Sequence, residues 1–186
     1  MIQIKNAAEL QKMRKACAIS AAALKAGGEA IEPGITTAEI DKIIYDFIVR
    51  HGARPNFLHL YGFPATACIS VNDTVIHGIP NKQQQIRPGD IVSIDTGCKI
   101  DGFNGDNACT YACGKIDLEA QRLLDVTKES LHRGIEMACG GNRVGDIGHA
   151  VQSYVEENGF SVVRTFVGHG VGKEPVSYTH LRAHET

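Results

Sequence analysis

The stretch "SIDTGCKIDGFNGDNACTY" (residues 93–111) decides the fold, because it has the pattern of two strands joined by a tight turn. Asp101 and Gly102 form the Asp-Gly pair that favours a two-residue hairpin turn. With that turn Asp95 lies opposite residue 108, so Asp106 is its diagonal neighbour on the same face. The sequence therefore predicts two carboxylates side by side on a β-hairpin.

Paired carboxylates in a strand interior repel each other and lose hydration. A divalent cation between Asp95 and Asp106 would remove both costs, since hard oxygen ligands suit such ions. The alternative is an exposed polar face that carries aspartate for solubility. The apolar flanks "IVSI" and "ACTY", and the scarcity of aspartate in strands, favour the metal site.

Two histidines accompany this pair. His77 stands in "VIHGIP", an apolar context where a hydrogen-bonded core histidine is the alternative, and His169 stands between glycines in "FVGHGVG". Glycines allow a close backbone approach. A lone histidine is more often structural than a ligand, but the paired aspartates favour His169 as a third ligand.

The elements around the hairpin suggest an internal repeat. Helices are expected over residues 6–31, 36–51, 118–138 and 146–158, and strands over 65–71, 91–98, 104–112 and 160–166. A shift of 107 residues lays "GITTAEIDKIIYDFIVRHG" over "GNRVGDIGHAVQSYVEENG", with matched glycines at both ends. Chance amphipathic similarity is the alternative, but the glycines favour a repeat of helix, helix and strands. The second copy stops after its first expected strand.

Composition excludes several classes of protein. The 186 residues suit one domain, and the net charge of −2 gives no basic surface for nucleic acid. No run is long enough to span a membrane, and the N-terminus lacks a signal-peptide pattern, so a cytoplasmic protein is expected. The six cysteines have no framework spacing and are expected to be free thiols rather than metal ligands.

The stretches "GFPATACISVNDTVIHGIP", "RPGDIVSIDTGCKIDGFNGD" and "FVGHGVG" follow one family pattern in order and spacing. The chain resembles the type I methionine aminopeptidases of the pita-bread metallopeptidases, family M24, from residue 1 to about 173. That resemblance implies an α+β fold with a pseudo-two-fold αα-β repeat, truncated in its second half. It also implies removal of the initiator methionine from nascent proteins.

The resemblance also implies roles for individual residues. Asp95, Asp106 and His169 would be metal ligands for the two divalent ions (Co, Mn, Fe or Zn) of the complete enzyme, with Asp106 bridging them. His77 would be catalytic, contacting the substrate without ligating metal. The residues that fall where the family lines its methionine pocket are Tyr61, Phe63 and Cys68. The implied partners are nascent polypeptide N-termini, with the ribosome as a candidate, and a monomer is expected for the complete enzyme.

The C-terminal residues depart from the family pattern. After "GVGKE" the family has a second histidine and two glutamate ligands, whereas this chain continues with "PVSYTHLRAHET". His180 and His184 have helical spacing, but neither they nor Glu174 and Glu185 are expected to replace those ligands. We expect residues 1–174 to be an incomplete catalytic domain and 175–186 to be a non-family tail. Such a chain would be inactive alone and prone to aggregate.

Two other functions stay open. One is an Xaa-Pro peptidase of the same fold, which "VIHGIP" and the short N-terminus disfavour. The other is a non-catalytic pita-bread module that binds protein or RNA. The neutral charge and the presence of Asp95, Asp106 and His169 argue against that module.

Overall fold

The structure is a computed structural model that describes residues 4–166 and 168–175. The chain divides into two units, one formed mainly by residues 4–116 and the other by residues 117–170. His180, His184 and Glu185, which were not expected to be ligands, lie outside the described residues.

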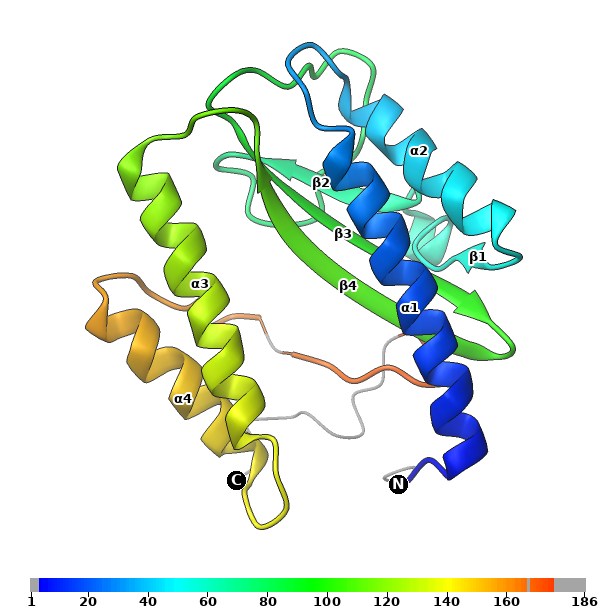
Figure 1. Ribbon diagram of the computed structural model, residues 1–186, viewed down its shortest axis with the longest axis vertical. Coiled ribbons are helices and arrows are strands. Elements are labelled where there is room, and N and C mark those ends of the chain that lie inside the picture. The colour runs from blue at the N-terminus through cyan, green and yellow to red at the C-terminus, as the bar shows by residue number, and fades with distance from the viewer. Residues whose placement is uncertain (1–3, 167, 176–186) are drawn as a thin grey trace. The chain divides into compact units, whose positions relative to one another are not determined.

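The first unit contains two helices and four strands, and residues 171–175 belong to it as well (Figure 1). Its elements are α1 (Ala7–Glu29), α2 (Thr37–Arg50), β1 (Arg54–Pro55), the 3-10 turn η1 (Leu60–Gly62), β2 (Ala67–Val71), β3 (Ile91–Ile100) and β4 (Phe103–Ala112). Asn6 and Thr36 cap the two helices, each accepting a hydrogen bond from a glutamate amide three residues later. The predicted helices and the hairpin are therefore confirmed, with ends that differ by a few residues.

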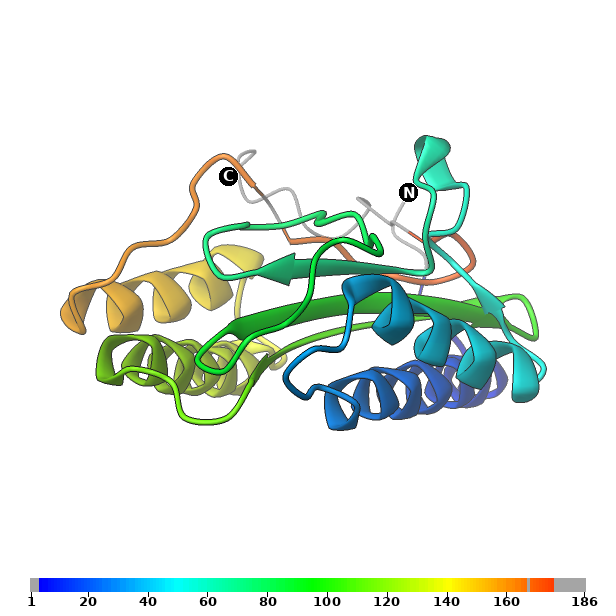
Figure 2. The same cartoon turned by 90° about the horizontal axis from the view of Figure 1, so that it is seen from above.

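Strand β3 is the centre of an antiparallel sheet. Strands β1 and β2 pair with successive parts of β3, and β4 pairs with it along its whole length. Figure 2 shows α1 and α2 on one side of this sheet and the loop that follows β2 on the other. One face of the sheet is therefore covered by helices.

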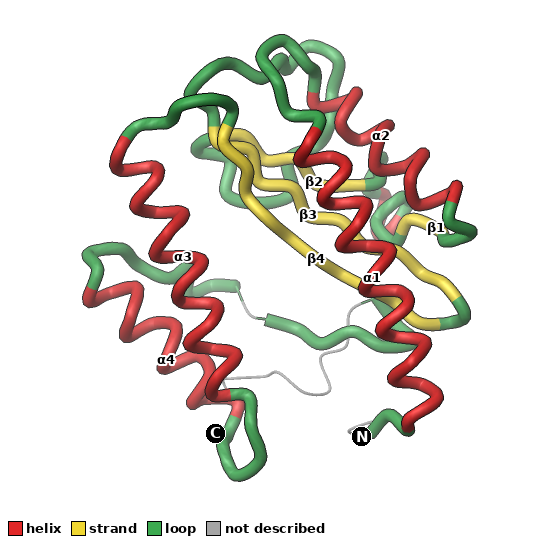
Figure 3. Tube along the Cα trace, viewed as in Figure 1, coloured by secondary structure: helices red, strands yellow, loops and turns green. Residues whose placement is uncertain are grey.

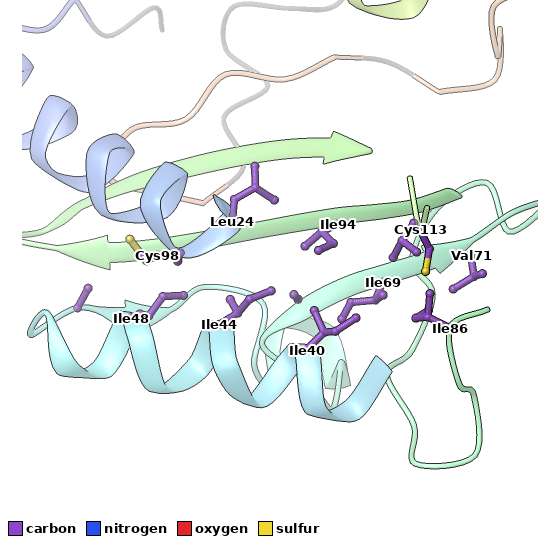
Figure 4. Close-up of a cluster of buried hydrophobic side chains, with 14 residues drawn as sticks. Leu24, Ile40, Ile44, Ile48, Ile69, Val71, Ile86, Ile94, Cys98 and Cys113 are labelled. Carbon is purple, nitrogen blue, oxygen red and sulfur yellow. The ribbon is translucent and has the colours of Figure 1, made fainter. Parts of the chain in front are cut away.

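The core lies between the sheet and α2. Ile40, Ile44 and Ile48 recur every four residues, so they share one face of α2, and each is 0% exposed. Figure 4 shows this row facing Ile69 of β2 and Ile94 of β3, which alternate with polar residues along their strands. This apolar layer fixes the register of the strands, because a slip of one residue would move the apolar side chains of the slipped strand to the other face of the sheet.

The second unit contains a helical pair. Helix α3 spans Leu118–Met137 and α4 spans Val144–Glu157, and they pack against each other. Asp117 caps α3 by accepting a hydrogen bond from the amide of Ala120 at 2.7 Å. Within the pair, the guanidinium of Arg133 lies 3.9 Å from the centre of the Tyr154 ring.

The strand predicted over residues 160–166 is wrong. This segment is a loop that contains a turn at residues 164–165 (Figure 3). A strand needs a neighbouring strand for its backbone hydrogen bonds, and no strand is described among residues 117–166. An apolar, β-branched composition alone could not provide that partner.

The repeat itself is confirmed in the helices. Helices α2 and α4 each have 14 residues and occupy equivalent positions after the shift. The turns before them contain Gly34 and Gly141, with φ of 97° and 100°, and the turns after them contain Gly52 and Gly159, with φ of 72° and 79°. The four glycines match because both copies require left-handed backbone at the same two places.

Candidate metal centre

The β3–β4 hairpin brings Asp95 and Asp106 together as predicted. Asp95 pairs with Ala108 and Gly97 pairs with Asp106, so the two carboxylates are diagonal neighbours on one face of the sheet. The turn between the strands is formed by Asp101 and Gly102, both with positive φ. This register depends on a turn of two residues, since one more residue would move Asp106 to the opposite face.

This face is opposite to the one that packs on α1 and α2. Val92 and Ile94 belong to the apolar core, so Asp95 points the other way by the alternation of a strand. Both aspartates are half-buried. Because they are partly buried, their attraction to a neighbouring positive charge is stronger than it would be between groups in free solvent.

The pKa of Cys68 is affected by the negative charges on this face. It lies directly opposite Asp95 in the pairing of β2 with β3, and it is 6% exposed. Burial, together with the negative charges of Asp95 and Asp106, raises the pKa of the Cys68 thiol to about 12. The thiol therefore stays neutral at physiological pH, and the surroundings disfavour any additional negative charge.

The donor set fits a divalent cation. Two half-buried carboxylates on one face provide the oxygen ligands and negative charge that such an ion requires. In residues 4–166 and 168–175, no group of three or more His, Cys, Asp and Glu side chains converges as a metal site. His169 belongs to the second unit, where its Nδ1 lies 3.1 Å from the carbonyl oxygen of Gly170.

His77 is attached to the same face of the sheet through its neighbour. The amide of Gly78 donates to the Ser70 hydroxyl at 3.1 Å, and the Gly78 carbonyl accepts from the Ile69 amide at 2.8 Å. Ser70 is two residues from Cys68 in β2, so both side chains share the face of Asp95. His77 itself is exposed and adopts a left-handed conformation with φ of 57°.

Glycine is required beside His77. A Cβ atom at Gly78 would lie 2.2 Å from the carbonyl oxygen of Ile69 and 2.9 Å from the Cα of Ser70. Both atoms belong to the backbone of β2 and cannot move aside. The Gly in "VIHGIP" therefore lets the chain carrying His77 approach the strand closely.

The predicted pocket residues differ in their surroundings. Tyr61 is 96% exposed with φ of 49°, Phe63 is half-buried, and Cys68 is buried within β2. Cys68 lies in the sheet itself, on the face that carries the aspartates. The role of these three residues in binding methionine stays a prediction.

Two contacts near the site were not predicted from the sequence. The Oδ1 atom of Asp41 accepts hydrogen bonds from the amides of Thr66 and Ala67, at 2.9 and 2.8 Å, and so holds the start of β2. Asn104 binds the carbonyl oxygen of Gly172. An Asp on a helix and an Asn in a strand have no local pattern that reveals such distant partners.

The sequence of this chain is similar to those of known metallopeptidases. The model of metallopeptidase family M24 matches residues 11–185. The methionine aminopeptidase of Clostridium perfringens is 51% identical over 174 residues, which are 94% of this chain and 70% of that protein. Methionine aminopeptidase 1 of Bacillus subtilis is 45% identical, with the same coverage.

Solved structures show the same fold. The methionine aminopeptidase of Rickettsia prowazekii is 37% identical, with a TM-score of 0.94 over 97% of this chain and 73% of that chain. The enzyme of Thermotoga maritima is 39% identical, with a TM-score of 0.93 over 95% of this chain and 71% of that chain. A prolidase from Pyrococcus furiosus, at 24% identity and a TM-score of 0.82, shares the fold.

This chain therefore belongs to metallopeptidase family M24. Its fold is the α+β pita-bread fold of the methionine aminopeptidases, as the resemblance in sequence implied. The chain spans about 70% of the length of three curated relatives that it matches, from two Clostridium species and Bacillus subtilis. The boundary at residue 174 stays a prediction.

Proposed function

We propose that this chain is the larger part of a metal-dependent aminopeptidase that removes the initiator methionine from nascent proteins. The observation that carries this function is the diagonal pairing of Asp95 and Asp106 on one half-buried face of the β3–β4 hairpin. The relatives named methionine aminopeptidase, at 41–51% identity, support the same activity.

We assign Asp95, Asp106 and His169 as protein ligands of two divalent ions. Cobalt, manganese, iron and zinc all suit a set of oxygen and nitrogen donors. When bound, such ions activate a water molecule and polarise the peptide carbonyl as Lewis acids. The two carboxylates hold the positive charge in place, and the rigid ladder of β3 and β4 fixes their separation.

His77 has the substrate-contacting role in this proposal. Its exposed ring can reach a bound peptide, while Gly78 keeps the backbone attached to β2. Cys68 would contribute to the pocket for the methionine side chain, since a neutral buried thiol is a small apolar surface. Tyr61 and Phe63 would complete that pocket.

The partners and the compartment are part of the proposal. The substrates are the N-termini of nascent polypeptides, the ribosome is a candidate partner, and the complete enzyme acts as a monomer in the cytoplasm. None of the described helices is long and apolar enough to cross a membrane. The net charge of −2 gives no reason to expect specificity for nucleic acid.

A metal titration of Asp106→Asn tests the proposal. We expect Co²⁺ to bind the parent chain and to bind the variant at least about tenfold more weakly, since the amide lacks the negative charge. Asp73→Asn is the matched control, because Asp73 is an exposed aspartate in the loop after β2. Equal binding by Asp106→Asn and the parent would overturn the assignment of the metal site.

Peptide assays separate the alternative functions. For a chain extended to the length of its relatives, we expect release of methionine from Met-Ala-Ser and no cleavage of an Xaa-Pro peptide. Cleavage of the Xaa-Pro peptide alone would favour the proline-specific alternative. Metal-independent binding of protein or RNA, without cleavage of either peptide, would favour the non-catalytic module.

A further inference from the structure

The carbonyl oxygen of Gly172 is held by one residue twice. The backbone amide of Asn104 donates to it at 2.9 Å, and the side-chain Nδ2 of Asn104 donates to it at 2.8 Å. Asn104 is 0% exposed and lies in β4, next to the hairpin turn. Two donors from one rigid strand fix both the position and the orientation of the Gly172 peptide group.

The next peptide group is held as well. The Nζ atom of Lys99, which pairs with Asn104 across the hairpin, donates to the Lys173 carbonyl oxygen at 2.8 Å. The Lys173 side chain in turn lies 3.3 Å from a carboxylate oxygen of Glu9 in α1. We call residues 171–175 the strap. Two successive carbonyl groups of the strap are therefore attached to the end of the hairpin.

The strap is a short tether for His169. Only two residues lie between His169 and Gly172, so their Cα atoms are within about 11 Å of each other whatever the conformation between them. Asn104 is two residues from Asp106 on β4, which is about 7 Å along a strand. The bond between Asn104 and Gly172 thus attaches the strap to β4 two residues from Asp106.

We propose that Asn104 is a positioning residue, which holds the strap so that His169 reaches the metal bound by Asp106. This inference rests on the proposed function. The chemistry of the side chain agrees with this role, because Nδ2 is used in the strap bond while the buried Oδ1 has no hydrogen-bond partner among the described residues. A buried acceptor without a partner is unfavourable. In the side chain of Asn104 it is therefore the Nδ2 donor, and not the oxygen, that contributes to holding the strap.

Asn104→Leu tests the proposal, because leucine has a similar size and removes both the donor and the unpaired acceptor. We expect Co²⁺ affinity, measured by calorimetry on the full chain, to fall by about 10- to 100-fold, the usual effect of losing a group that orients a ligand. Asn107→Leu is the matched control, since Asn107 also lies in β4 and has a buried Nδ2 that finds no partner within residues 4–166 and 168–175.

A double variant shows whether Asn104 acts through His169. If it does, adding Asn104→Leu to His169→Ala leaves the Co²⁺ affinity of His169→Ala unchanged. Amide hydrogen exchange of residues 170–174 should also become faster in Asn104→Leu and stay unchanged in Asn107→Leu. This readout detects loss of the side-chain bond to the strap in the absence of metal, while the backbone amide of residue 104 can still donate to Gly172.

The outcomes separate the two proposals. If His169→Ala binds Co²⁺ as tightly as the parent, or if the parent binds none, the proposed metal site is wrong and the role of Asn104 falls with it. If His169→Ala weakens binding and Asn104→Leu does not, the positioning role alone is overturned. Equal losses in Asn104→Leu and Asn107→Leu would also overturn it, since they would indicate a general effect on β4.

Discussion

The two helical pairs of this chain share their local structure and differ in their burial. Gly27 of α1 lies against α2, where a Cβ atom would be 2.7 Å from the Cδ1 of Ile44. The equivalent Gly134 of α3 lies against α4, where a Cβ atom would be 2.9 Å from the Cγ2 of Val151. Each pair therefore packs with a glycine against the equivalent aliphatic residue.

The difference lies in what covers the pairs. Ile44 is 0% exposed and packs between α1 and the sheet, whereas Val151 is half-buried, and Leu131 and Ile135 of α3 are each 59% exposed. Caps, glycines and apolar spacing are sufficient to specify a helical pair. Deep burial requires a sheet as well, and the described part of the second unit contains none.

Truncation of the equivalent aliphatic residues should give the largest contrast. We expect Ile44→Ala to lower the free energy of unfolding by about 3 kcal/mol, because it leaves a cavity in a closed core. Val151→Ala should cost only about 1 kcal/mol, because its site is already partly open to solvent. Helix-resolved hydrogen exchange under native conditions measures each unit separately. Equal losses would contradict the comparison and show α3 and α4 to be as tightly packed as α1 and α2.

The paired glycines should give the next largest contrast. Gly27→Ala forces a new methyl group against the fully buried Ile44 and should cost about 1–2 kcal/mol. In Gly134→Ala the new methyl group lies against the half-buried Val151. The free-energy cost of this clash should be offset by about 1 kcal/mol of improved helix propensity. Urea unfolding followed by circular dichroism would measure both changes. A stabilised Gly27→Ala variant would refute the close packing of α1 on α2.

These contrasts show how far the sequence could predict the molecule. The hairpin register follows from Asp101 and Gly102, and the position of Asp106 beside Asp95 follows from that register. Short-range rules suffice there, because a turn type fixes which residues oppose each other. The prediction of a strand over residues 160–166 was wrong for the opposite reason, since a strand depends on a partner elsewhere in the chain.

Contacts between distant segments were also beyond prediction. Asn104 and Gly172 are 68 residues apart, and Asp41 lies 25 residues before the Thr66 amide that it binds. Neither residue has a local signature, because any buried Asn or Asp could find its partner in many places. The sequence could therefore identify the candidate metal ligands more readily than the residues that position them.

The helix caps should give a smaller contrast of opposite sign. Thr36 caps α2 with its hydroxyl, which accepts from the Glu39 amide at 3.2 Å, whereas Arg143 at the equivalent position of α4 has no such oxygen. Thr36→Ala should cost about 1 kcal/mol, and Arg143→Thr should stabilise α4 by a similar amount. Protection of the first-turn amides against hydrogen exchange is the measurement. A destabilising Arg143→Thr would mean that the two N-termini are not equivalent.

The smallest contrast concerns pH. Asp41 binds the amides of Thr66 and Ala67 at the start of β2, while its equivalent in α4 is Gly148, which has no side chain to bind a strand. Burial raises the pKa of Asp41, and the hydrogen bonds from Ala67 and Thr66 oppose this only in part. A raised pKa means that the folded state binds the proton more tightly than the unfolded state does. The contribution of Asp41 to stability is therefore complete below its unfolded pKa and declines as the pH rises through its folded pKa.

Asp41→Asn separates the charge of Asp41 from its hydrogen bonds, because the asparagine oxygen can still accept from both amides. We expect the stability of Asp41→Asn relative to the parent to increase as the pH rises from about 4, and then to become constant once Asp41 is ionised in the folded state. Urea unfolding at a series of pH values measures this. The control is Asp46→Asn, which removes a half-buried partner of Lys42 on the same helix and should not gain stability over that range. A constant difference for Asp41→Asn at all pH values would show that the desolvation of Asp41 is fully compensated by its bonds to β2.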